Sequence, residues 1–290
     1  MNMILEAKSP AKTKVMEAVK PVETEEETRN RIQAELFKLG FTKCPPEILD
    51  RLVIFENFSK FNEDSRMVKR GVENTLDNLN RKNKLKLTPE QKCDVVLASF
   101  FSDIGKSSSS DDQLCQLAVI KLFSVGQLED PNKITVEETL KIFLPDEVEA
   151  IISNLSKIGI TRDMSMRNFF DMHAFWTKDV LDQNKDVFSK RMVEIASSHH
   201  VVQGINPCGI DEEKIPNDLK YCIYALMAVD KYQARVERSK ATHEEAIDFL
   251  KNDPKGLKKY ASSPIMISVI KLIDELGKAE ALFKAPEAKK

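Results

Sequence analysis

Glycine is scarce in this chain. Only nine of its 290 residues are glycine, and alternating runs of β-branched residues are few. Both features argue against a sheet-rich fold, because β-strands favour β-branched residues and the turns between them favour glycine. The five cysteines are scattered, odd in number and without a Cys-x-x-Cys pair. This usage fits a reducing compartment, with the thiols packed as small apolar groups.

Long apolar runs are also missing. The longest, at about residues 95–101, is interrupted by Ser99, and no stretch approaches the length of a membrane span. The N-terminus has a short apolar patch that is broken by Glu6, and it lacks the apolar core of a signal peptide. We therefore expect a cytoplasmic protein with no membrane partner.

The chain has no large excess of either charge. Its net charge is −2, and its 44 basic residues are interleaved with acidic ones. This gives no global electrostatic case for nucleic-acid binding, so we expect no DNA partner. A composition that is 42% hydrophobic and 31% charged is ordinary for a soluble globular protein. The length allows one large or two modest domains with a sizeable core.

Helical periodicity is present almost everywhere, and capping signals mark where helices begin. Thr88 precedes Pro89, which is an N-cap residue followed by proline at the first helical position. Capping-box pairs stand at Thr24 and Glu27, Thr135 and Glu138, and Thr242 and Glu245. We predict an all-α fold, and we find no internal repeat of fixed period.

The most informative stretch is Ala196–Ile210. It contains His199 and His200, two of only four histidines, at the end of an apolar helical run and before a turn-rich loop. Adjacent imidazoles at such a change of direction can both enter one pocket. Because imidazole is the commonest protein ligand of transition metals, the pair suggests a metal site. The alternative is a chance pair at a helix end.

Several segments together resemble the HD superfamily of metal-dependent phosphohydrolases, and within it the HD-GYP branch. Residues 97–106, Leu-Ala-Ser-Phe-Phe-Ser-Asp-Ile-Gly-Lys, are similar to the motif in which His-Asp precedes Ile-Gly-Lys. His173 and the pair His199-His200 match the following histidines. Residues 204–210 resemble the loop that names the branch, and residues 224–232 resemble the last ligand helix, with Asp230 as its carboxylate.

The resemblance implies an HD-domain helical bundle that spans residues 61–280. A helical extension at 24–60 would precede it, and a helical segment at about 107–160 would be inserted in it. Residues 1–23 and 281–290 would be flexible tails.

The resemblance also implies a site for one or two transition-metal ions, with iron or manganese expected and zinc as an alternative. One ion would be bound by Asp103, His173, His199 and His200. A second ion would use Asp103 as a bridge, with Asp230 and, as an upstream ligand, Asp64. Asp103 and Lys106 would be the catalytic residues. Phosphate groups of the substrate would contact Lys106 and either Arg235 or Arg238.

The chain departs from the family pattern at three places. Ser102 stands where the family has the histidine of its His-Asp pair, and serine is a poor ligand for transition metals. Gly204-Ile-Asn-Pro207 replaces the glycine, tyrosine and proline run, and Gln233 stands where a second aspartate usually follows. Ser102 therefore predicts a weakened second ion site.

Two classes of function remain open. The first is a metal-dependent phosphodiesterase that acts on cyclic di-guanylate or a related nucleotide. The second is a catalytically impaired signalling module that keeps the fold and binds a nucleotide or a partner protein.

Some of the candidate site residues can instead have purely structural roles. Asp103 can be only a helix-end residue, and Lys106 can be solvated like most lysines. Asp230 is harder to dismiss, because a carboxylate in an apolar helix needs a partner.

Overall fold

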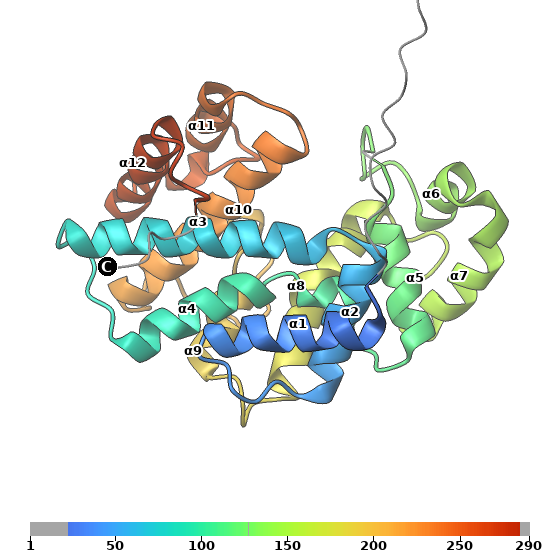
Figure 1. Cartoon of the computed structure of the whole chain (residues 1–290). Helices are drawn as coiled ribbons and strands as arrows, with labels where there is room; N and C mark the ends of the chain where they lie inside the picture. The colour runs from blue at the N-terminus through green and yellow to red at the C-terminus, as the bar shows by residue number, and fades with distance from the viewer. Residues whose placement is uncertain (1–22, 127, 285–290) are drawn as a thin grey trace, which may run out of the picture.

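The computed structural model describes residues 23–126 and 128–284. In this part of the chain the protein is all-α, as the sequence predicts, with one isolated β-bridge and no strand (Figure 1). The α-helices are α1 (Glu25–Lys38), α2 (Pro46–Phe58), α3 (Phe61–Arg81), α4 (Pro89–Phe101), α5 (Gln113–Phe123), α6 (Val136–Phe143), α7 (Val148–Ser156), α8 (Met166–Asp182), α9 (Lys190–Ser197), α10 (Asn217–Glu237), α11 (His243–Asn252) and α12 (Pro264–Lys278). Short 3-10 helices are η1 (Ile104–Ser107), η2 (Pro145–Glu147), η3 (Val201–Gln203) and η4 (Lys258–Tyr260).

The predicted helix starts are confirmed by their caps. The side chains of Thr24, Thr88, Thr135 and Thr242 each accept a hydrogen bond from the backbone N–H three residues on. The side chain of the residue three positions on reaches back to the backbone of the cap in all four cases. Such a cap satisfies N–H groups that have no partner inside the helix, which is why these positions start helices.

The main hydrophobic core is built around α3, which packs on α4, α10 and α12, while α4 also packs on α9. The helices α1 and α2, predicted as an extension, contribute to this same core. Ile32, Leu36 and Ile48 are fully buried in it. Residues 24–60 are therefore an integral part of the main unit.

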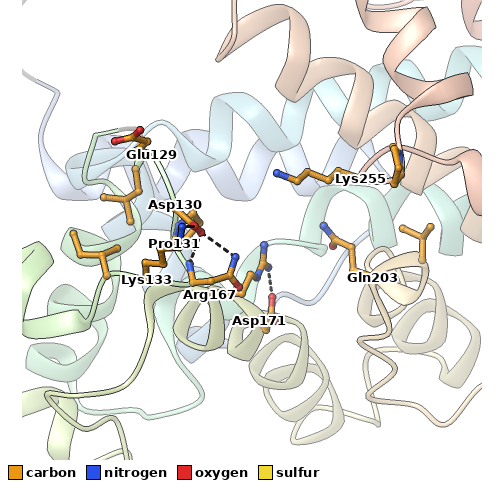
Figure 2. Close-up of a pocket in the computed structure, with 14 residues that line it drawn as sticks. Glu129, Asp130, Pro131, Lys133, Arg167, Asp171, Gln203 and Lys255 are labelled. Atoms are coloured by element: carbon orange, nitrogen blue, oxygen red, sulfur yellow. Dashed lines mark hydrogen bonds and ion pairs between the residues drawn. The ribbon is translucent and has the colours of Figure 1, made fainter.

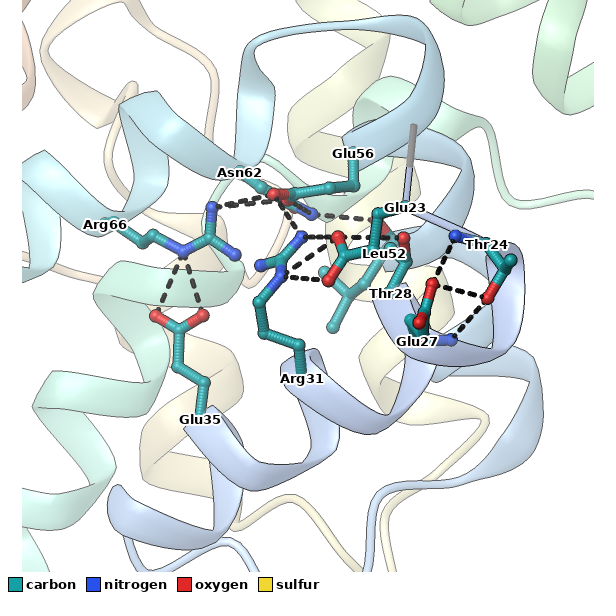
Figure 3. A network of polar contacts seen from close by, with 10 residues as sticks. All are labelled: Glu23, Thr24, Glu27, Thr28, Arg31, Glu35, Leu52, Glu56, Asn62 and Arg66. Atoms are coloured by element: carbon teal, nitrogen blue, oxygen red, sulfur yellow. Dashed lines mark hydrogen bonds and ion pairs between the residues drawn. The ribbon is translucent and has the colours of Figure 1, made fainter. Parts of the chain in front are cut away.

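A polar network fastens α1 and α2 to α3 (Figure 3). Arg66 of α3 pairs with Glu35 of α1 at 2.8 Å and with Glu56 of α2 at 3.2 Å. Arg31 of α1 reaches the same Glu56 at 2.8 Å, and Asn62 donates to it at 2.8 Å. Three helices thus share one carboxylate, and these partly buried pairs fix the angle at which α1 and α2 meet the core.

A second, smaller core lies between α5, α6, α7 and the first half of α8, within the region predicted as an insertion. The bridge between Thr135 and Ser165 joins the loops that precede α6 and α8. In α8, Phe169 belongs to this second core and Leu181 to the main core. Because α8 is packed at both ends, it is a rigid support for the side chains between them.

The predicted C-terminal tail begins with an anchored segment, so its predicted start at 281 is too early. Leu282 is buried, and the Asn74 side chain donates to the carbonyl oxygens of Ala281, Leu282 and Lys284. The rest of that tail, and residues 1–22 of the N-terminal tail, lie outside the described residues. No helix in the described part of the chain is long and apolar enough to cross a membrane.

Candidate metal centre

Asp103 is held beside α8 by a close approach of two backbones. A Cβ atom on Gly105, in the η1 turn, would lie 2.1 Å from the carbonyl oxygen of His173. The hydroxyl of Thr177 accepts a hydrogen bond from the Gly105 N–H at 3.1 Å and donates one to the Ser102 carbonyl at 2.9 Å. These contacts bring Oδ1 of Asp103 to 3.7 Å from Nε2 of His173.

His199 and His200 lie in the chain reversal after α9. That helix ends at Ser197, and Gly204, with φ 84°, ends the η3 turn. The ring centroids of His199 and His200 are 4.0 Å apart, and that of His173 lies 5.3 Å and 4.7 Å from them. One ligand nitrogen from each of the three lies within 4.8 Å of the others. We call these three residues the histidine cluster; both rings of the pair belong to it.

Backbone carbonyls fix the tautomers of two members of the histidine cluster. Nδ1 of His199 lies 2.6 Å from the Ala196 carbonyl oxygen, and Nδ1 of His173 is bonded to the Phe170 carbonyl. A carbonyl only accepts, so each Nδ1 carries the hydrogen and each Nε2 presents a lone pair. The two Nε2 atoms lie 3.3 Å apart, and Oδ1 of Asp103 lies 3.8 Å from Nε2 of His199. Three acceptors therefore face one another.

Burial disfavours protonation of two of the imidazoles, those of His173 and His200. Desolvation lowers the pKa of His173 to about 3. The negative charge of Asp103 opposes this shift, whereas the positive charge of Lys106, and that of His199 in its protonated form, adds to it. Desolvation also lowers the pKa of His200 well below its ordinary value. Burial acts to raise the pKa of Asp103, but the adjacent Lys106 ammonium lowers it, as do His173 and His199 in their protonated forms, and the net pKa is low, so the carboxyl is ionised. Neutral imidazoles and an ionised carboxylate are the forms that bind a metal.

His200 supplies a further sign of a missing partner. Its Nδ1 is buried and has no hydrogen-bond partner among the described residues. A buried nitrogen without a partner is costly, and native structures rarely leave one. Together with the facing acceptors of His173, His199 and Asp103, this nitrogen makes the donor set of the pocket fit a transition-metal ion.

Lys106 occupies the other oxygen of Asp103. Its Nζ lies 2.6 Å from Oδ2, with both side chains about one-tenth exposed. The ammonium also lies 4.9 Å from the centre of the Phe61 ring. The sequence predicts Lys106 as a phosphate ligand, whereas in the structure its partner is a carboxylate inside the protein. Asp103 thus presents Oδ1 to the histidine cluster and Oδ2 to Lys106.

The residues predicted for a second ion are not members of the histidine cluster. Asp64 accepts hydrogen bonds from Gln233 at 2.9 Å and from Arg238 at 3.3 Å. Burial acts to lower the pKa of Arg238, but the charges of Asp230, Asp103 and Asp64 raise it. The half-exposed guanidinium of Arg238 therefore pairs with Asp64, the upstream carboxylate that the resemblance assigns to a second ion.

Two other predicted positions also have partners inside the protein. The guanidinium carbon of Arg235 lies 4.5 Å from the centre of the Phe249 ring, where it is stabilised by the face of the ring. Ser102 donates its hydroxyl to the Ser99 carbonyl at 3.2 Å, at the C-terminal end of α4.

The sequence interpretation missed Arg51, which holds the chain that follows η1. This fully buried side chain of α2 donates to the carbonyls of Ser107, Ser108 and Ser110, to the Ser107 hydroxyl and to the carboxylate of Asp111. A signal was present, since Arg51 lies among apolar residues of an otherwise buried helix face. A buried arginine needs several acceptors, and the serine-rich loop supplies them.

Comparison with models of known protein families, with curated proteins and with solved structures gave no match for this chain.

Proposed function

We propose that the protein binds one transition-metal ion through the histidine cluster and Asp103, and that it is a divergent HD-type protein. The observation that carries this proposal is the close approach of three acceptor atoms: Nε2 of His173 and Nε2 of His199 are 3.3 Å apart, and Oδ1 of Asp103 lies 3.7 Å and 3.8 Å from them. Acceptors that face one another repel unless a cation lies between them. Neutral imidazoles with one carboxylate suit iron, manganese or zinc.

One ion is favoured over two by the cations that the protein itself supplies. The Lys106 ammonium lies 2.6 Å from Oδ2 of Asp103, which is the oxygen a bridging carboxylate would give to a second ion. Arg238 pairs with Asp64, the predicted upstream ligand. A second dication would have to displace both cations, against their charge, and Ser102 offers no imidazole in return.

A single ion favours a signalling module over an efficient enzyme. A metal ion can polarise a phosphodiester and lower the pKa of bound water, but two-ion sites share the charge that develops on both oxygens. Without the second ion, several kcal/mol of transition-state stabilisation are missing. We therefore propose that the protein binds a nucleotide or a partner protein and reports on it, with the metal stabilising the binding-competent fold.

A slow phosphodiesterase is the second candidate, favoured by the fixed cation beside Asp103. Lys106 is held by that carboxylate and by Phe61, so it would partly replace the charge of a second ion. The assay is turnover of cyclic di-guanylate with saturating Mn²⁺ or Fe²⁺. Turnover that disappears in Asp103→Ala supports the enzyme; nucleotide binding without turnover supports the module.

Metal content tests the proposal. Protein purified without chelator should contain about one equivalent of iron, manganese or zinc per chain, and His200→Ala should lose it. His243→Ala is the matched control, because His243 is the fourth histidine and bonds Tyr232 and Asp274 outside the site. Removing the metal with a chelator should lower the melting temperature of the wild type and leave that of His200→Ala unchanged. Wild-type protein that stays metal-free after reconstitution would refute the proposal.

A further inference from the structure

Two hollows in the surface of the described chain differ in their charge. The larger, of about 1130 Å³, lies between the loop at 128–134 and the turn at 254–256 (Figure 2). Its three cations are matched by three carboxylates, and two of the cations are already in ion pairs, Lys133 with Asp130 and Arg167 with Asp171. This balance leaves the larger hollow without a net charge with which to select an anion.

The smaller hollow, of about 210 Å³, lies between α12 and the chain that follows α3. Three lysines and one carboxylate line it: Lys82, Lys84, Lys271 and Glu275. Lys82 pairs with Glu275, whereas Lys84 and Lys271 form no ion pair within the described part of the chain. The hydrogen bond from Lys82 lowers the pKa of the Glu275 carboxyl most, and the charges of Lys271 and Lys84 lower it further, so all three ammonium groups lie around this one carboxylate. Three cations against one anion leave an excess of two positive charges.

Ser268 adds a hydroxyl to the two unpaired lysines. Nζ of Lys84 donates to Oγ of Ser268 at 3.2 Å, so the hydroxyl accepts there and keeps its own hydrogen for another acceptor. That hydrogen has no acceptor among the residues that the structure describes. Because Ser268 and Lys271 are three residues apart on α12, they lie on the same face of the helix. Two ammonium groups and a hydroxyl suit the oxygens of a phosphate monoester, which is close to a dianion at neutral pH.

The size of the smaller hollow indicates that it holds a phosphate group rather than a whole ligand. Sites for small molecules have volumes of about 300–1,000 Å³. The hollow is also closed on the inside by Leu79 and Leu272, which are 1% and 3% exposed. The remainder of a phosphorylated ligand would therefore lie on the surface outside the hollow.

The surface around the smaller hollow offers more charge and an apolar contact. The loop at 81–86 contains four exposed cations and no carboxylate: Arg81, Lys82, Lys84 and Lys86. Ile267 of α12, next to Ser268, is 51% exposed. None of the residues that line the hollow is aromatic, so it has no ring on which a nucleobase would stack. A phosphorylated peptide with acidic and apolar neighbours matches this surface better than a nucleic acid does.

We propose that the smaller hollow binds a phosphoserine or phosphothreonine in an acidic segment of a partner protein. The phosphate contacts Lys84, Lys271 and the Ser268 hydroxyl. Acidic neighbours of the phosphorylated residue contact Arg81 and the rest of the loop at 81–86. The site uses no residue of the proposed metal centre and does not rest on the function proposed for it.

Fluorescence anisotropy of a labelled, end-capped peptide with the full chain tests this inference. The peptide carries a phosphoserine between a leucine and two glutamates, and its control carries plain serine. The phosphorylated peptide should bind at least about tenfold more tightly than the control. Its affinity should fall as salt is added, because the attraction is between exposed charges.

Variants of the lining lysines locate the phosphate. Lys84→Gln and Lys271→Gln change exposed side chains that form no ion pair, and each should weaken binding of the phosphorylated peptide about tenfold, the usual value of a charge-assisted hydrogen bond. Lys258→Gln, an exposed lysine that does not line the hollow, is the matched control and should leave binding unchanged. Melting curves check that all three variants fold as the wild type does.

Several results would overturn the inference. They are equal affinity for the two peptides, no binding of either, or an equal loss in Lys271→Gln and Lys258→Gln. Tighter binding of oligouridine RNA or of phosphatidylserine vesicles than of the phosphorylated peptide would assign the surface to another partner and refute the proposal. The titration is repeated on His200→Ala to separate the hollow from the metal centre. Binding that persists there supports the hollow, whereas binding that disappears there would place the phosphate at the metal and refute the proposal.

Discussion

Replacing Gly105 by alanine should damage both the fold and the metal centre. The added Cβ would lie 2.1 Å from the His173 carbonyl oxygen and 2.4 Å from the Thr177 nitrogen, and both are backbone atoms of α8 that cannot rotate away. Since ordinary van der Waals contact begins at 3.4 Å, η1 must move from α8 by roughly an ångström or more. The move breaks the hydrogen bonds that Thr177 makes with Gly105 and Ser102.

The magnitude follows from these contacts. Overpacking costs about 1–3 kcal/mol, and each of the two lost hydrogen bonds adds about 1 kcal/mol. We expect the metal-free Gly105→Ala protein to lose about 3–5 kcal/mol of unfolding free energy in urea titrations. Because Asp103 precedes the same turn, its Oδ1 moves away from His173, and metal affinity should fall by about 10–100-fold.

Gly159→Ala is the control for this experiment. Gly159 has φ +80° and nothing within 4 Å of an added Cβ, so its cost is backbone strain alone, about 1 kcal/mol. It should leave metal affinity unchanged. If Gly105→Ala is no less stable than Gly159→Ala and binds metal as the wild type does, the close packing of η1 on α8 does not position Asp103.

Two further predictions concern charged groups in the core. Arg51→Met removes five hydrogen bonds and leaves buried carbonyls unpaired, so it should lower the free energy of unfolding in urea by about 3–5 kcal/mol. Arg51→Lys should recover only part of that loss. An unchanged urea midpoint in Arg51→Met would contradict this prediction. The second concerns pH: His173 has a pKa of about 3 in the folded metal-free protein, below its unfolded value of about 6.5, so only the unfolded state binds a proton between them. Its contribution to stability is present above pH ~6.5 and is lost as the pH falls, by about 2 kcal/mol between pH ~7 and ~5. His173→Gln should flatten that slope, and an equal slope in both proteins would show that His173 is not held neutral.

The helices were predictable because their signals are local. Each confirmed cap consists of a threonine and a partner three residues on, so no distant contact is needed to recognise it. The integration of residues 24–60 was not predictable in this way. It depends on where Ile32 and Leu36 pack and on how Arg66 meets Glu35, and both involve positions far apart in the chain.

The pair of His199 and His200 was predictable because the two are neighbours in sequence. His173 of α8 was expected there only from the resemblance, and its ring does lie beside the pair. The partners of the charged residues were not predictable. Lys106 pairs with Asp103 three residues earlier, a spacing that a solvated lysine would share. Arg238 meets Asp64 from the opposite end of the chain. Whether a charge is free for a ligand depends on such contacts, and sequence patterns do not encode them.

The most direct test of the central claim is anomalous diffraction from crystals of protein purified without chelator, measured at the absorption edges of iron, manganese and zinc. We predict a single strong peak bounded by Nε2 of His173, Nε2 of His199, a ring nitrogen of His200 and Oδ1 of Asp103. Lys106 should remain on Oδ2 of Asp103. No peak in crystals of metal-loaded protein, a peak elsewhere, or a second peak between Asp103 and Asp64 would contradict the single-ion site.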